Sequence, residues 1–130
     1  MAFYVDTSAL VKLVVAESET AALRAWLEEP GRELVASDLA RTELMRAIRS
    51  VVPDRVLQAR EVLDAVTLLH VTPAVFEDAG RLDPCELRSL DAIHLAAALD
   101  LGDDLEGLIT YDERLADAAV SNGVAVVAPR

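Results

Sequence analysis

Four acidic residues stand at places in the sequence from which they could act together. Asp6 directly follows the first apolar run of the chain, and Asp112 follows a later one. Glu43 lies a short way into one helical pattern, and Asp91 lies in the first turn of another. In an open parallel sheet, side chains at the carboxyl ends of the strands gather around one crevice. We therefore expect the four carboxylates to point toward one end of the fold.

Carboxylates gathered in this way would bind a hard divalent cation. Asp6 and Asp91 both stand within apolar sequence, and burying several like charges is costly unless a cation neutralises them. Oxygen ligands favour Mg²⁺ or Mn²⁺ over zinc. Such ions lower the pKa of a bound water and stabilise a leaving oxygen, as hydrolysis of a phosphodiester requires. Each acid also has an ordinary interpretation, as a solvated surface group or, for Asp91 and Asp112, as a residue favoured at a helix start.

Short apolar runs alternate with longer helical patterns along the chain. The runs predict strands at 3–5, 34–36, 68–71, 108–110 and 124–127. The periodic segments predict helices at 8–15, 19–28, 37–51, 53–66, 72–80, 90–101 and 112–122, two of them capped by Ser8 and Ser89. Strands separated by helices favour a parallel sheet that is covered on both faces. We predict a single three-layer α/β domain over residues 1–130.

Composition and charge exclude several classes of protein. The chain has 130 residues, of which 53% are apolar, so it can form a core and is not a disordered tail. Its formal net charge of −11 argues against a general binder of duplex DNA. The single cysteine, Cys85, excludes an internal disulfide and a cysteine-based zinc site. The sequence has neither a secretory signal nor an apolar run long enough to span a membrane, so we expect a cytoplasmic protein without a membrane partner.

Four motifs resemble, in order, those of a known family. They are D-T-S-A-L at 6–10, S-D-L-A-R-T-E-L at 37–44, L-D-A-I-H-L-A-A-A at 90–98 and T-Y-D-E-R-L at 110–115. Together they resemble the motifs of PIN-domain ribonucleases, specifically the VapC-type toxins of VapBC toxin–antitoxin systems. The resemblance covers nearly the whole chain, and four ordered motifs are far more specific than the first alone.

This resemblance implies a fold, an activity and a set of partners. The fold would be a three-layer PIN-like domain with five parallel strands in the order 3-2-1-4-5. The activity would be that of a metal-dependent endoribonuclease, the toxin of a type II toxin–antitoxin pair. The expected partners are an RNA substrate, a VapB-type antitoxin and a second copy of the chain.

The resemblance also implies roles for individual residues. The catalytic residues, which would also bind Mg²⁺ or its substitute Mn²⁺, would be Asp6, Glu43, Asp91 and Asp112. Hydroxyl groups in a supporting role would be those of Thr7, Ser8 and Thr110. Asp117 matches an additional acid of some family members, although here its position is more typical of a solvated surface residue.

Two other interpretations stay open on the sequence. A phospho-receiver domain has a similar length and acids around Mg²⁺, but it needs a lysine beside its last strands and an aspartate at the end of the third. The only lysine is Lys12, and the third predicted strand ends at Val71, so this interpretation is weak. A PIN-fold interaction module without catalysis is also compatible with the sequence, and a metal-dependent RNase assay separates it from the enzyme.

The remaining conspicuous residues have simpler interpretations. His94 lies about one helical turn beyond Asp91, and we expect it to pack or hydrogen-bond behind the acids rather than to act as a general base. His70 and Trp26 are expected to be structural. Arginines that flank the acidic motifs and could hold phosphates are Arg41, Arg46, Arg88 and Arg114. An apolar stripe forms either core or a groove for an antitoxin, and comprises Leu10, Leu13, Val14, Leu23, Trp26 and Leu27.

Overall fold

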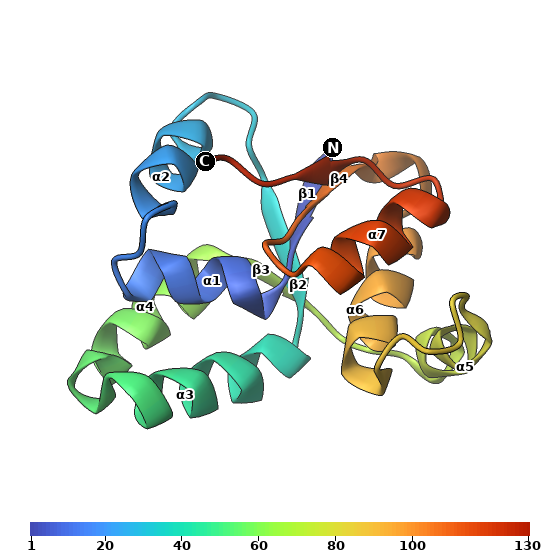
Figure 1. The fold of residues 1–130 in the computed structure, drawn as a ribbon, viewed down its shortest axis with the longest axis horizontal. Coiled ribbons are helices and arrows are strands. Elements are labelled where there is room, and N and C mark those ends of the chain that lie inside the picture. The colour runs from blue at the N-terminus through green and yellow to red at the C-terminus, as the bar shows by residue number, and fades with distance from the viewer.

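Strands and helices alternate along the whole chain (Figure 1). The computed structural model describes residues 1–130. The strands are β1 (Ala2–Val5), β2 (Leu34–Ser37), β3 (Thr67–Leu69), β4 (Leu105–Ile109) and β5 (Val126–Val127). The helices are α1 (Thr7–Val14), α2 (Thr20–Leu27), α3 (Leu39–Val51), α4 (Val56–Ala65), α5 (Pro73–Arg81), α6 (Ser89–Leu99) and α7 (Glu113–Ser121). Short 3₁₀ turns at Pro53–Arg55 and Gly102–Asp104 precede α4 and β4.

All strands run parallel in one sheet. The order of its five strands is β3-β2-β1-β4-β5, so the predicted fold class and strand order are confirmed. The central strand is β1, in which Tyr4 pairs with Val35 of β2 and Leu108 of β4. Because β1 is central, Asp6, which follows it, lies in the middle of the carboxyl edge of the sheet.

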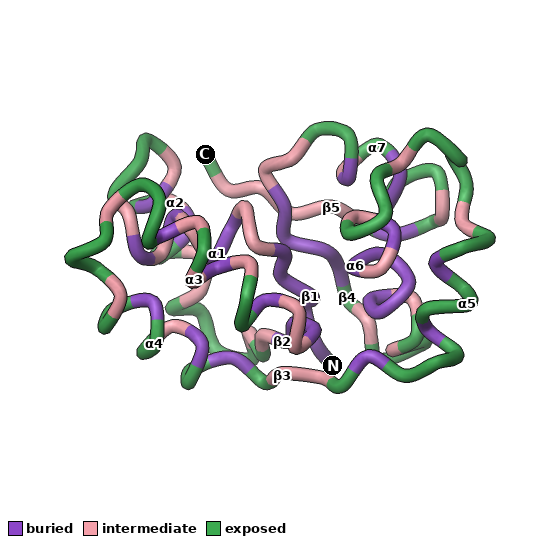
Figure 2. Tube along the Cα trace, turned by 90° about the horizontal axis from the view of Figure 1, so that it is seen from below, coloured by how far each residue is buried: buried purple, intermediate pink, exposed green.

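A separate apolar core covers each face of the sheet. In Figure 1, α1 to α4 lie on one side of the strands and α5 to α7 on the other. Val5 and Ile109 belong to the core under α1, α3 and α4, whereas Tyr4 and Leu108 belong to the core under α5, α6 and α7. Neighbouring strand residues point to opposite faces, so one strand supplies side chains to both cores. Figure 2 shows the resulting buried stretch along β1 and β4 in the middle of the molecule.

Two predicted helix caps are wrong. Asp6, not Ser8, caps α1, because its carboxylate accepts the N–H of Ala9 at 3.2 Å. Ser89 is the first residue of α6 rather than its cap, and the preceding residue, Arg88, has extended backbone. A carboxylate that ends a strand can reach the free N–H groups of the next helix, so the hydroxyl of Ser8 is available for other contacts.

Some strand boundaries also differ from the prediction. The edge strand β3 covers 67–69 rather than 68–71, and β5 covers only 126–127. Each of these strands has a partner on one side only, so its pairing ends sooner than its apolar sequence does. The fourth strand, β4, begins earlier than predicted, at Leu105.

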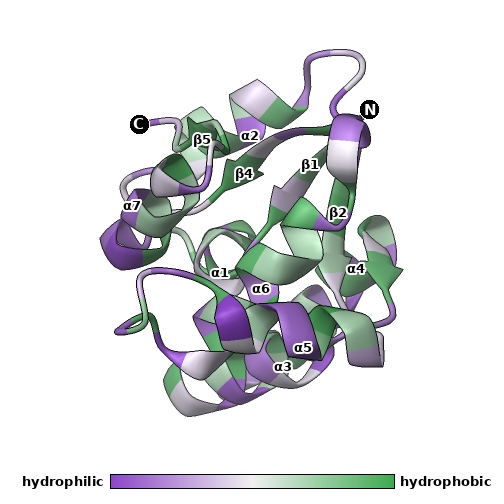
Figure 3. Ribbon diagram, turned by 90° about the vertical axis from the view of Figure 1, so that its right-hand side faces the viewer, coloured by the Kyte–Doolittle hydropathy of each residue, from purple (hydrophilic) through white to green (hydrophobic).

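The helices are short, and most are amphipathic, whereas α6 is apolar on nearly all sides and buries Ala92 and residues 94–98. In Figure 3 they carry both purple and green bands, as expected of helices that pack one face on a sheet. The longest, α3, has 13 residues and buries Ala40, Leu44 and Ile48. Helix α7 ends at Ser121, and the chain leaves it at the predicted stop, Gly123, whose φ of 79° glycine adopts without strain. None of the helices combines the length and apolar character that crossing a membrane requires.

Candidate acidic active site

Asp6 is the buried centre of the candidate site. Its side chain lies between the end of β1 and the start of α1, and the residue is only 4% exposed. Oδ1 accepts hydrogen bonds from Ser8 Oγ at 2.7 Å and from the N–H of Ala9, and Oδ2 accepts one from Thr110 Oγ1 at 2.8 Å. Both carboxylate oxygens are therefore held in place by groups from α1 and from the end of β4.

Burial raises the pKa of Asp6 above its ordinary value. The hydrogen bonds from Ser8, Thr110 and Ala9 oppose this shift, because they favour the ionised form, but the loss of hydration outweighs them. An ionised Asp6 is therefore costly in the protein alone, and a positive charge beside it would be favoured.

The hydroxyls of Ser8 and Thr110 connect Asp6 to the loop that carries Asp112. Ser8 Oγ accepts the N–H of Tyr111 at 3.0 Å, and Thr110 Oγ1 accepts the N–H of Asp112 at 3.1 Å. Each hydroxyl thus donates to Asp6 and accepts from the backbone between β4 and α7. These hydrogen bonds fix the position of the Asp112 backbone relative to Asp6.

Glu43 lies on α3 beside the first residue of α1. Its Oε1 accepts hydrogen bonds from Thr7 Oγ1 at 3.2 Å and from His94 Nε2 at 2.5 Å. His94 is 2% exposed, and its other ring nitrogen contacts Tyr4 Oη at 2.7 Å. The expectation that His94 hydrogen-bonds behind the acids is thus met, and Tyr4 is a participant that the sequence analysis missed.

Arg88 connects the two remaining acids. Its Nε lies 3.3 Å from Asp91 Oδ2, and its Nη2 lies 3.6 Å from Asp112 Oδ2. Asp112 also caps α7, because its Oδ1 accepts the N–H groups of Arg114 and Leu115 at 2.9 and 3.2 Å. The cap interpretation of Asp112 is therefore correct, and it leaves Oδ2 facing Arg88. A cavity of about 370 Å³ in this region is lined by Glu43, Arg88, Ser89, Leu90 and Asp91.

The donor atoms of the site suit a hard divalent cation. All four side chains offer carboxylate oxygens, and the neighbouring groups are hydroxyls, which is the donor set of Mg²⁺ and Mn²⁺ sites. No three His, Cys, Asp or Glu side chains are already arranged as a cluster that could hold a metal ion. Instead the guanidinium of Arg88 is the cation between Asp91 and Asp112. The two acids attract a positive charge, and a metal ion would have to displace Arg88.

Asp117 is not part of the hydrogen bonds and ion pairs that connect the four acids. It is exposed on α7 and lines a surface hollow with residues that include Glu86, Leu87 and Arg114. His70 is exposed and contacts Asp38 at 3.2 Å, so it stabilises the surface between β3 and α3 rather than a core. Trp26 packs as expected, nearly perpendicular to the ring of Phe3, and the centroids of the two rings are 4.7 Å apart.

The apolar stripe on α1 and α2 is divided between core and surface. Leu10, Val14 and Leu23 are fully or nearly fully buried. Leu13 and Leu27 instead line a cavity of about 330 Å³, together with Arg24, Glu28, Leu34, Val62, Ala65 and Val66. The core interpretation is therefore confirmed for Leu10, Val14 and Leu23, whereas a groove for an antitoxin at Leu13 and Leu27 stays a prediction.

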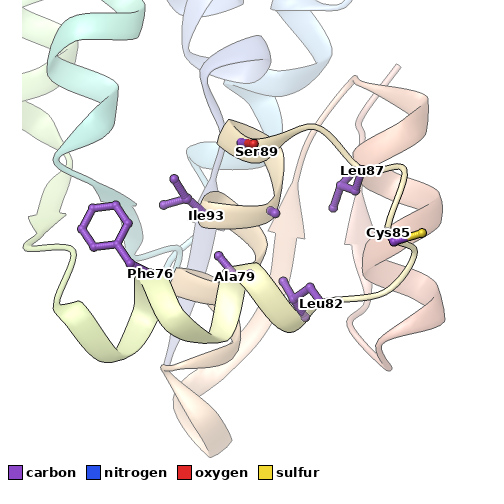
Figure 4. Close-up of a pocket in the computed structure, with 9 residues that line it drawn as sticks. Phe76, Ala79, Leu82, Cys85, Leu87, Ser89 and Ile93 are labelled. Carbon is purple, nitrogen blue, oxygen red and sulfur yellow. The ribbon is translucent and has the colours of Figure 1, made fainter.

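A second apolar cavity adjoins the start of α6. Figure 4 shows it between α5, the start of α6 and the connection that joins them, with Phe76 and Ile93 on one side and Leu82 and Leu87 on the other. Its volume is about 340 Å³. Cys85 also lines the cavity and is exposed, in the connection between α5 and α6. No carboxylate lines this cavity, although Ser89 also lines the cavity beside Asp91.

Comparison with known proteins gives a consistent family assignment. The model of the PIN domain family matches residues 3–121. Ribonuclease VapC46 of Mycobacterium tuberculosis is 48% identical over 128 residues, which are 98% of each chain. Ribonuclease VapC47 of the same species is 42% identical over 130 residues, 97% of this chain and 96% of the relative.

Solved structures have the same fold. Mycobacterium tuberculosis VapC20, described as a toxin that cleaves the sarcin–ricin loop, aligns with a TM-score of 0.77 over 98% of this chain and 99% of its own, at 20% identity. A toxin–antitoxin complex from Klebsiella pneumoniae aligns with a TM-score of 0.74 over 100% of this chain and 98% of its own, at 22% identity. On the family match and the close relatives, this chain belongs to the PIN-domain family and, within it, to the VapC ribonucleases.

Proposed function

We propose that the chain is a metal-dependent endoribonuclease that acts as the toxin of a type II toxin–antitoxin pair. Two close relatives carry the name ribonuclease, and the fold neighbours include a toxin and a toxin–antitoxin complex. The observation that carries the proposal is the network around Asp6. Hydrogen bonds and ion pairs through Thr110 and Arg88 connect it to Asp112 and Asp91.

The four acids would hold the metal, and the hydroxyls would hold the acids. Asp6, at the centre of the sheet edge, is the ligand best placed to contact more than one ion. When bound, Mg²⁺ or Mn²⁺ supplies the positive charge that a phosphodiester needs and lowers the pKa of a water that can attack phosphorus. Ser8 and Thr110 orient Asp6, and Thr7 orients Glu43, so the carboxylates do not need to reorganise during the reaction.

RNA would approach an acidic protein at an edge that also carries arginines. Arg41, Arg46 and Arg114 are exposed and flank the acidic motifs. A guanidinium binds a phosphate through two parallel hydrogen bonds, so these residues can offset the repulsion that the net charge of −11 creates. Arg88, once displaced from the acids, is a further phosphate contact at the same place.

The test is RNA cleavage by the purified chain with and without metal. Cleavage is expected with Mg²⁺ or Mn²⁺ and should disappear in excess chelator. Asp91→Asn should remove it, whereas Asp117→Asn, which changes the charge equally at an exposed position outside the site, should retain it. Full cleavage in chelator would refute the metal mechanism. No cleavage with either ion would favour the interaction module without catalysis.

An antitoxin and a second copy of the chain are the proposed partners. The cavity lined by Leu13, Leu27, Leu34 and Val62 offers an apolar surface, and the acidic chain favours a partner segment with Arg or Lys. Co-expression with a VapB-type antitoxin should yield a complex in which RNA cleavage is suppressed. Sedimentation of the chain alone measures whether it forms the expected homodimer, and a monomer at all concentrations would refute that part.

A further inference from the structure

A continuous line of hydrogen bonds runs through the core to Glu43. The N–H of Ser37 donates to Tyr4 Oη at 3.1 Å, Tyr4 Oη lies 2.7 Å from His94 Nδ1, and His94 Nε2 lies 2.5 Å from Glu43 Oε1. Tyr4 is 0% and His94 2% exposed. Water cannot satisfy these polar groups, so each must find its partner within the line.

The chemistry of the groups sets the direction of every hydrogen bond. An ionised Glu43 only accepts, so His94 Nε2 must carry a proton. A neutral imidazole has one N–H, which leaves Nδ1 as an acceptor for the hydroxyl of Tyr4. The oxygen of Tyr4 then accepts the N–H of Ser37. The opposite tautomer would bring a bare Nε2 against a carboxylate oxygen.

We propose that Tyr4 and His94 are positioning residues that orient the carboxylate of Glu43 for the metal ion. The proposal rests on the proposed function, in which Glu43 is a ligand. His94 and Thr7 both donate to Oε1, so Oε2 carries no hydrogen bond from the protein and is the oxygen left for a ligand. A glutamate side chain has three rotatable bonds, and holding one oxygen removes most of that freedom before the ligand arrives.

The position of the line in the fold supports this role. Tyr4 lies on the central strand, Ser37 ends β2 immediately before α3, and Glu43 lies on α3 itself. The line therefore connects α3, which carries Glu43, to β1, which immediately precedes Asp6, and to α6, which carries Asp91. Removing a hydrogen bond to a metal ligand typically lowers metal affinity or activity by about 10- to 100-fold.

Nitrogen NMR of the histidines tests the direction of the hydrogen bonds without any metal. The chain has two histidines, and His70, whose side chain is 83% exposed, serves as the internal control. We expect Nε2 of His94 to carry the proton of the hydrogen bond to Glu43, and Nδ1 to respond to the hydroxyl of Tyr4. In Tyr4→Phe the Nδ1 resonance should move toward that of a free lone pair, with His70 unchanged. A wild-type His94 without a proton on Nε2, or an Nδ1 resonance identical in the variant, would overturn the proposal.

Binding of Mn²⁺ tests the positioning role. Tyr4→Phe keeps the ring and removes the hydroxyl, and we expect it to weaken Mn²⁺ binding by about 10-fold. His94→Leu should weaken binding by up to about 100-fold, and His94→Gln, which keeps an N–H donor, should recover part of that loss. The matched controls are Tyr111→Phe and His70→Gln, and both should bind Mn²⁺ as the wild type does. The hydroxyl that Tyr111→Phe removes contacts the carbonyl of Pro129.

Kinetics and folding separate positioning from simple packing. If Tyr4 and His94 position Glu43, Tyr4→Phe and His94→Leu should lower kcat for RNA cleavage and leave KM nearly unchanged. The circular dichroism of both variants should match that of the wild type. If Tyr4→Phe and His94→Leu bind Mn²⁺ like the wild type and only melt at lower temperature, the residues are core alone and the proposal is wrong. If the wild type neither binds Mn²⁺ nor cleaves RNA, the proposed function fails and the positioning role falls with it, even where NMR finds His94 protonated at Nε2.

Discussion

Removing the guanidinium of Arg88 should tighten the binding of Mn²⁺. In the structure Arg88 contacts Asp91 at 3.3 Å and Asp112 at 3.6 Å, so it occupies the position that a metal ion between these acids would need. Arg88→Gln keeps a polar side chain of similar reach but removes the charge. The metal then no longer competes with a cation that belongs to the protein.

The size of the effect follows from the exposure of the ion pairs. The Arg88 side chain is 66% exposed, and a pair at such a surface contributes about 0.2–1 kcal/mol. Two pairs together contribute about 1 kcal/mol, which corresponds to about fivefold tighter binding of Mn²⁺. In chelator the variant should melt about 4 °C below the wild type, because Asp91 and Asp112 lose their counter-charge. Saturating Mg²⁺ should close this gap.

Titration calorimetry with Mn²⁺ at fixed ionic strength measures the affinity. Removal of any arginine makes an acidic protein more attractive to cations, so Arg114→Gln is the matched control. Arg114 is exposed near Asp112, and its side chain forms no ion pair in the structure. If Arg88→Gln binds Mn²⁺ no more tightly than Arg114→Gln does, Arg88 does not compete with the metal.

Three further predictions concern separate parts of the molecule. Asp112→Asn should lower RNA cleavage by about 100-fold or more but lower the melting temperature by only about 2 °C, because asparagine caps a helix as well as aspartate does and only the ion pair with Arg88 is lost, whereas Asp117→Asn should change neither. The hydrogen bond from Lys12 lowers the pKa of Glu19 from its ordinary 4.5 to about 2, so the stability from ionised Glu19 is present above about pH 4.5 and is lost as the pH falls toward 2. Urea unfolding across this range should show a smaller acid loss in Glu19→Gln, and an equal loss would contradict the assignment. Leu44→Ala, at a 0% exposed position of α3, should lower the free energy of unfolding by about 2–5 kcal/mol, and a loss below 1 kcal/mol would mean that the core there is not close-packed.

Local patterns in the sequence were sufficient for the elements and their order along the chain, whereas the order of the strands in the sheet came from the resemblance to PIN domains. The apolar runs and helical periodicities predicted the number and order of the strands and helices, because burial on a sheet requires those spacings. The placement of Asp6 and Asp112 at the sheet edge also follows locally, since the residue after a parallel strand lies at its carboxyl end. Cap assignments were less successful. Asp6 and Ser8 can both cap α1, and the choice between them depends on the other contacts of the hydroxyl.

The connections among the site residues were decided only by the tertiary structure. Tyr4 and His94 are 90 residues apart in sequence, and His94 and Glu43 are 51 apart. Their contact requires α6 to cross the sheet beside β1 and α3 to begin at the adjacent strand end. The ion pair between Arg88 and Asp112 likewise depends on how the start of α6 meets the loop after β4. Sequence periodicity specifies which face of an element is buried, but a hydrogen bond needs two atoms within about 3 Å, and only the packing of distant elements sets such distances.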